Sequence, residues 1–195
     1  MAIPSTPLAV AVVALATTLE LSAQAAAGPK WGPVTGGLSI GVSIGFAEGQ
    51  SNRAPLEISL KNNFENDFVV NLGTMLTNGK VMFPEAVRLI AVDPMGTSRE
   101  LHFFDRRYPG IAGRLDDFIV ALRGGATYTF TVSTDQYWSP ATRELPLKWA
   151  PGVNRVSARF DGRDASHVNL DMHGVTLLNF WIGSANSGVV QLVAR

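Results

Sequence analysis

Hydrophobic and polar residues alternate with a period of two along most of the chain after Gly28. Leu38, Ile40, Val42 and Ile44, for example, are separated by serine or glycine. Successive side chains of a β-strand point to opposite faces, so this alternation predicts strands with one buried face and one face in water. About ten short segments share the pattern and are the predicted strands: 38–44, 56–61, 68–72, 87–91, 99–103, 118–122, 128–132, 145–147, 156–160 and 190–194.

Turn-forming residues separate these strands. Asp93-Pro94-Met95-Gly96, Gly124-Gly125 and Asp161-Gly162 each predict a tight turn. No stretch keeps an apolar period of 3.6 long enough for a substantial helix. The chain is therefore predicted to be all-β, with an antiparallel sandwich or barrel architecture.

The predicted connections are uneven in length. Most are short, but segments 73–85, 104–116, 135–143 and 162–188 are long. Loops of more than about 12–15 residues are uncommon in a compact domain unless they carry function or structure of their own. Function is therefore expected in these loops rather than in the strands.

The first 27 residues differ in composition from the rest. Leu8 to Leu15 form an apolar run, and Ala25-Ala26-Ala27 has the small-x-small form of a signal peptidase site. The run is shorter than the about 20 residues that cross a bilayer, so no membrane span is predicted. We expect a signal peptide over residues 1–27, a single domain over 28–195 and an extracytoplasmic location, periplasmic or secreted. The alternative is a buried N-terminal helix, since no Lys or Arg precedes Lys30.

Composition and charge exclude several classes of protein. Hydrophobic residues make up 46% of the chain and charged residues 16%, which is typical of a folded domain. Lys and Arg together equal Asp and Glu at 16 each, so no basic excess favours nucleic acid. The chain has no cysteine, which excludes disulfides, thiol nucleophiles and cysteine-based metal sites. No motif indicates a cofactor.

The segments 54–63, 87–96, 122–128 and 151–160 look like sandwich strands and their turns. In these segments the chain resembles bacterial immunoglobulin-like modules, including the intracellular proteinase inhibitor family. The resemblance implies an immunoglobulin-like antiparallel β-sandwich with long loops. It also implies protease inhibition as one special case of binding. Asn154 stands where such modules have a corner tyrosine, so the resemblance supports the fold more than the function.

One segment has side chains that could bind a metal. In an extended 167–173, His167, Asp171 and His173 point to the same side. Two imidazoles and a carboxylate are ligands for zinc or another divalent metal. The alternative is a solvated polar face.

Two further segments combine aromatic and charged residues. Arg106, Arg107 and Tyr108 follow two phenylalanines, and Tyr137 and Trp138 lie in the 135–140 loop. Arg, Tyr and Trp are enriched at binding hot spots, so these five residues are candidate binding residues. In the alternative interpretation, the arginines pair with nearby aspartates and the aromatics anchor the loops to the core.

Catalysis has little support in the sequence. No G-x-S-x-G elbow is present, and adjacent carboxylates such as Asp116 and Asp117 point to opposite faces of a strand. We therefore predict an exported, non-enzymatic binding or accessory domain that contacts a protein or a carbohydrate through loops or edge strands. The alternatives are a metal-binding protein or metal-dependent enzyme centred on His167, Asp171 and His173, and a purely structural envelope protein.

Overall fold

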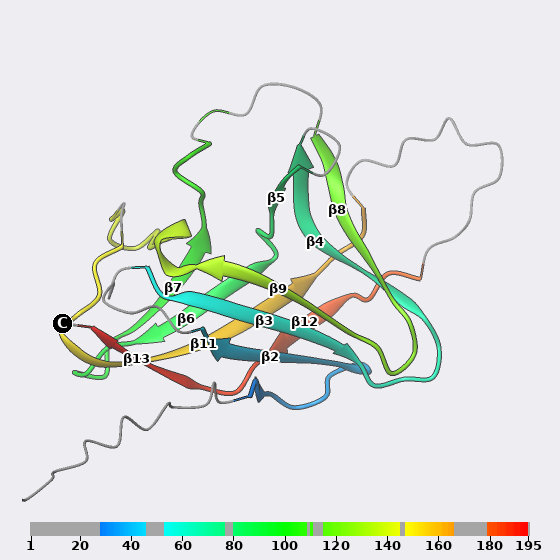
Figure 1. Cartoon of the computed structure of the whole chain (residues 1–195), viewed down its shortest axis with the longest axis horizontal. Coiled ribbons are helices and arrows are strands. Elements are labelled where there is room, and N and C mark those ends of the chain that lie inside the picture. The colour runs from blue at the N-terminus through cyan, green and yellow to red at the C-terminus, as the bar shows by residue number, and fades with distance from the viewer. Residues whose placement is uncertain are drawn as a thin grey trace, which may run out of the picture.

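A computed structural model describes residues 28–45, 53–76, 80–108, 110, 115–144, 147–165 and 179–194. Within these ranges the chain is built from β-strands, and the only helical element is one 3₁₀ turn, η1 (Thr134–Gln136). Antiparallel sheets pack over a shared apolar interior (Figure 1). This confirms the predicted all-β sandwich, while the immunoglobulin-like topology stays a prediction. In the described ranges, no helix has the length and apolar character needed to cross a membrane.

The strands in the described ranges form three sheets. The four-stranded sheet has the order β1 (Lys30–Trp31), β2 (Leu38–Ile44), β3 (Pro55–Asn62), β9 (Thr127–Ser133). The six-stranded sheet has the order β10 (Tyr137–Trp138), β7 (Ser98–Phe103), β6 (Val87–Val92), β11 (Gly152–Gly162), β12 (Gly183–Asn186), and β13 (Val190–Ala194) also pairs with β11. The three-stranded sheet has the order β5 (Val81–Phe83), β4 (Phe68–Leu76), β8 (Leu115–Leu122).

The four-stranded and three-stranded sheets are joined by a bent two-stranded ribbon. β3 pairs with β9, and the chain continues into β4, which pairs with β8 (Figure 1). Asn62 is fully buried at the bend. Its amide nitrogen donates to the Leu122 carbonyl at 3.1 Å, and its side-chain oxygen accepts the Phe64 N–H at 2.9 Å. The buried Asn62 side chain therefore links the β3–β4 connection to β8 at the bend of the ribbon.

The inward positions of the alternating pattern make the core. On β3, Leu56, Ile58 and Leu60 have no exposed surface. Trp181 closes the core beside β11, where its ring stacks on Phe160 with centroids 5.6 Å apart. Its indole N–H donates to the Gly36 carbonyl at 2.9 Å, so this large ring is both buried and hydrogen-bonded.

The predicted turn at Asp161-Gly162 is wrong. β11 continues through both residues, and Gly162 pairs with Gly183 of β12. A Cβ atom at Gly162 would lie 2.4 Å from the Trp181 ring. Glycine is required there because an aromatic ring approaches the backbone, and not because the chain turns.

The predicted strand at 145–147 is not found as such. Leu147 is buried but lies outside every strand, and Leu145 lies outside the described residues. Four strands were not predicted, namely β1, β5, β10 and β12. Each has only two to four residues, which is too short for an alternating pattern to be recognised.

The four-stranded and six-stranded sheets are connected at two places. On one side, β1 pairs with β2, and the Lys30 carbonyl accepts the Gly188 N–H at 2.9 Å from the loop between β12 and β13. On the other side, β9 runs through η1 into β10, which belongs to the six-stranded sheet. The segments predicted to bind lie at this second crossing.

Candidate functional site

Two segments that the sequence marks separately as binding candidates meet at one corner of the six-stranded sheet. β10 pairs with the end of β7, so that Tyr137 is opposite Phe103 and Trp138 is opposite His102. We call residues 102–108 together with 135–138 the β7–β10 corner. Strand pairing, rather than sequence proximity, brings these aromatic and charged residues together.

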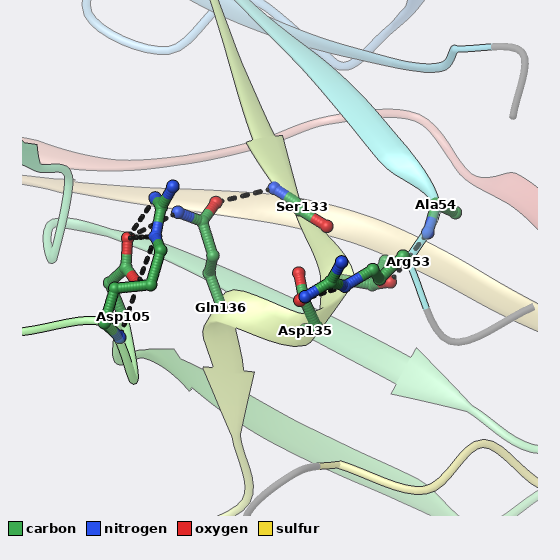
Figure 2. A network of polar contacts seen from close by, with 8 residues as sticks. Arg53, Ala54, Asp105, Ser133, Asp135 and Gln136 are labelled. Carbon is green, nitrogen blue, oxygen red and sulfur yellow. Dashed lines mark hydrogen bonds and ion pairs between the residues drawn. The ribbon is translucent and has the colours of Figure 1, made fainter. Parts of the chain in front are cut away.

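Asp105 organises the corner, as Figure 2 shows. Its side chain is only 6% exposed, and Arg107 binds both of its carboxylate oxygens. The Gln136 side-chain amide also donates to Asp105, at 2.9 Å. The hydrogen bonds from Arg107 lower the pKa of Asp105 and outweigh burial, which acts in the opposite direction. The carboxylate is therefore charged at neutral pH and fixes the loop after β7.

The same network reaches the end of β9. The side-chain oxygen of Gln136 accepts the backbone N–H of Ser133 at 2.7 Å (Figure 2). On the far side of η1, Arg53 pairs with Asp135 at 2.9 Å. Asp105 and Asp135 are thus each paired with an arginine. The Gln136 side chain connects the end of β9 to the loop after β7.

A row of aromatic rings lies beneath the corner. Phe83 packs edge-on against Tyr108 and against Phe103, with centroid separations of 5.8 and 6.4 Å. Phe103 in turn packs edge-on against Tyr137 at 5.5 Å. Tyr137 is fully buried, its hydroxyl donates to the Val87 carbonyl at 3.4 Å, and burial raises the pKa of this phenol. Tyr137 is therefore a core residue and leaves the set of candidate binding residues.

The other four candidates reach the surface at this corner. Arg106 is exposed, the Arg107 side chain is 70% exposed, and Tyr108 is 38% exposed. The Arg107 guanidinium lies 5.7 Å from the centre of the Tyr108 ring, within reach of a cation–π interaction. Trp138 is partly exposed and packs edge-on against His102. The corner therefore presents two aromatic rings and two arginines to solvent, over a buried base.

A row of ionisable side chains continues from Trp138 across the outer face of the six-stranded sheet. His102 contacts Glu100 at 2.9 Å, and Arg88 binds the same Glu100 oxygen at 2.7 Å. Burial raises the pKa of Glu100, but the hydrogen bonds from Arg88 and His102 outweigh it, and the pKa is lowered overall. The row ends at Asp161, which Arg159 binds at 2.9 Å. Sequence reasoning did not find this row, because its members come from β7, β6 and β11 and no spacing relates them.

The predicted metal ligands His167, Asp171 and His173 lie outside the described residues. Among the residues that are described, no three His, Cys, Asp or Glu side chains are grouped so that they could hold a metal ion. The metal hypothesis thus stays a prediction from the sequence.

Comparison with known proteins returns no match, either to protein-family models or to curated proteins. The resemblance to immunoglobulin-like modules and proteinase inhibitors therefore stays a prediction. The chemistry of the site rests on its own residues.

Proposed function

We propose that this protein is an exported, non-enzymatic binding domain that contacts a partner protein through the β7–β10 corner. The observation that carries the proposal is the pairing of β7 with β10, which brings the segment that carries Trp138 beside the segment that carries the two arginines and Tyr108. Arg, Tyr and Trp are the residue types that contribute most to protein interfaces.

The buried base of the corner supports this function. The Asp105–Arg107–Gln136 network and the aromatic row tie the loop to the body of the sandwich. A loop that is ordered before binding loses less conformational entropy when it binds. A surface that is built this way can contribute to affinity without rearrangement.

Charge favours a partner with acidic groups. The β7–β10 corner has two carboxylates, and an arginine binds each of them: Arg107 binds Asp105 and Arg53 binds Asp135. Arg106 is exposed and has no hydrogen bond or ion pair within the described ranges. Its guanidinium can form a bidentate pair with a carboxylate of the partner.

The test is capture of partners from an envelope extract by the immobilised protein, compared with the variants Arg106→Ala and Trp138→Ala. We expect a specific protein to be retained by the wild type and lost with both variants, and to bind again when it is purified separately. The matched controls are Arg123→Ala and Met95→Ala, which remove an arginine and a large apolar residue exposed elsewhere. Equal retention by all four variants would exclude the corner, and binding only to added polysaccharides would replace the protein partner by a carbohydrate.

A further inference from the structure

β9 forms one border of the four-stranded sheet. It pairs with β3 through seven consecutive residues, from Thr127 opposite Lys61 to Ser133 opposite Pro55. In the described part of the chain, no strand pairs with its other side. In Figure 1, β9 lies beside β3, on the side away from β2. A strand at such a border has backbone groups available for another strand.

The register shows which backbone groups these are. Just beyond the two ends of the pairing, the Asn62 N–H donates to the Ala126 carbonyl and the Thr134 N–H donates to the Ala54 carbonyl. Hydrogen-bonded pairs recur at every second residue of an antiparallel ladder. The even-numbered residues of β9 therefore direct their N–H and C=O groups to β3. The odd-numbered residues direct theirs to the free edge.

The free edge has a defined length. At Ser133 the N–H is already bound by the side chain of Gln136 at 2.7 Å. The backbone groups of Thr127, Thr129 and Thr131 have no hydrogen-bond partner within the described ranges. The open edge is therefore the five-residue segment 127–131, and its middle residue is Thr129.

β9 lacks the features by which proteins protect an edge strand. Proteins usually blunt edges with charged residues, proline, bulges or short length. Residues 127–133 include no charged residue, proline or glycine, and the register has no bulge. β10 and β1, by contrast, have two residues each, and the long β8 carries Asp116 and Asp117.

The open segment is symmetric in residue type. It reads Thr-Tyr-Thr-Phe-Thr, with the threonines exposed on the outer face of the sheet and the two aromatic rings partly buried on the inner face. If two copies pair antiparallel about Thr129, threonine is opposite threonine and Tyr128 is opposite Phe130. Like pairs of this kind stabilise antiparallel strands, and no charges repel across the junction.

We propose that two copies of this chain associate through β9, in an antiparallel pair centred on Thr129 that joins two four-stranded sheets into one. The hydrogen bonds of the open edge are then satisfied reciprocally, as a two-fold axis requires. Gln136 disfavours the register that is shifted towards Ser133. A pair centred on Phe130 would place Thr127 opposite Ser133, whose N–H is occupied.

Single cysteines test the register, because the natural chain has none. In the proposed pair, the Cα atoms of the two Thr129 residues are about 5.5 Å apart, which suits a disulfide. Under mild oxidation, Thr129→Cys should therefore cross-link into a dimer. Thr127→Cys alone should not, because the two cysteines would be about 13 Å apart. A mixture of Thr127→Cys and Thr131→Cys proteins should cross-link. Equal cross-linking at all three positions, or at none, would overturn the proposal.

Sedimentation of the full-length protein tests the association itself. The wild type should show a dimer that forms with rising concentration, and Thr129→Pro should be monomeric over the same range. This proline removes an N–H that points away from β3, so the intramolecular ladder is kept. The matched control Thr129→Ala also loses the contact with the Ser59 hydroxyl but keeps the backbone N–H, and it should still dimerise. A wild-type protein that is monomeric at every concentration would refute the proposal whether or not the proline variant folds.

Discussion

β9 and β10 are consecutive strands, separated only by η1, and each lies at the border of a sheet. β10 has two residues and is held by Tyr137 in the core and by the Asp105–Gln136 network beside it. β9 has seven residues, and most of its free edge has no such cover in the described ranges. β10 is thus a short border strand anchored by side chains, whereas β9 is a long one whose outer backbone groups are open to a partner strand.

Under the two proposals above, this difference corresponds to two kinds of recognition on one side of the molecule. β10 has only two residues, and the Tyr137 N–H is bound to the Thr134 carbonyl, so the proposed recognition there rests on exposed side chains such as Trp138 and Arg106. At β9 the backbone groups of the free edge are available to a partner strand, and the side chains only have to be compatible with those of that strand. Gln136 marks the boundary, since its side chain contacts both regions.

The largest effect is expected from Tyr137→Ala, which removes the anchor of β10. Deleting a buried aromatic ring costs about 3–5 kcal/mol, through lost burial and the cavity that remains. Urea denaturation followed by circular dichroism should show this loss. The neighbouring Trp138→Ala, at a partly exposed position, should cost clearly less. Similar losses at both positions would contradict the contrast between a buried and a surface aromatic.

Asp105→Asn should have the next largest effect. It removes the charge that Arg107 and Gln136 bind at a nearly buried position, at a cost of about 1–3 kcal/mol. Because the pKa of Asp105 is lowered in the folded protein, its contribution is complete at neutral pH. The contribution is lost as pH falls through the folded-state pKa. Denaturation curves from pH 7 downwards should therefore converge for wild type and variant. A constant difference at all pH values would exclude this role.

Gln136→Ala should cost about 1 kcal/mol, because the Ser133 N–H loses its side-chain partner but can bind water. The same variant should lengthen the open edge of β9 by one hydrogen-bonding residue. With the Ser133 N–H free, the register centred on Phe130 becomes possible, and it places Thr127 opposite Ser133. A mixture of Thr127→Cys and Ser133→Cys proteins, each also carrying Gln136→Ala, should then cross-link, whereas the same cysteines with Gln136 in place should not. If the cross-linking pattern is the same with and without Gln136, this side chain does not limit the edge.

Arg53→Ala should have the smallest effect. The pair with Asp135 is exposed at the arginine, with 68% of the Arg53 side chain accessible, and such pairs contribute less than about 1 kcal/mol. Any loss in the unfolding free energy should disappear in high salt, because screening weakens exposed ion pairs. A loss that persists in high salt would mean that Arg53 acts through packing instead.

The periodicity of the chain predicted most of the long strands, because one buried face leaves a regular mark on the sequence. Leu56, Ile58 and Leu60 are examples, and all three are fully buried. The sequence led to a wrong prediction where one residue type can have two structural reasons. Gly162 resembles a turn residue, but it is glycine because of Trp181.

Of the candidate site, the residue types could be predicted but their roles could not. The 102–108 and 135–140 segments were identified by composition, and the pairing of Arg107 with Asp105 agrees with the alternative in which arginines pair with nearby aspartates. Tyr137 and Trp138 were indistinguishable in sequence, yet one is buried and the other reaches the surface. Alternation shows only that neighbouring residues face opposite sides of a strand. Which of the two is buried is known once the strand's partner and its inner face are known.

The all-β class follows from the order of residues, because alternation within a strand is a local property of neighbouring residues. The absence of charge along β9 can also be read there, and it makes an open edge compatible with a second copy. The folded chain is needed to show that β9 is a border strand, that Gln136 closes one end of its edge, and that β10 joins β7. These are pairings between residues far apart in the chain, and hydrogen bonds between strands leave no periodic signal in either strand alone.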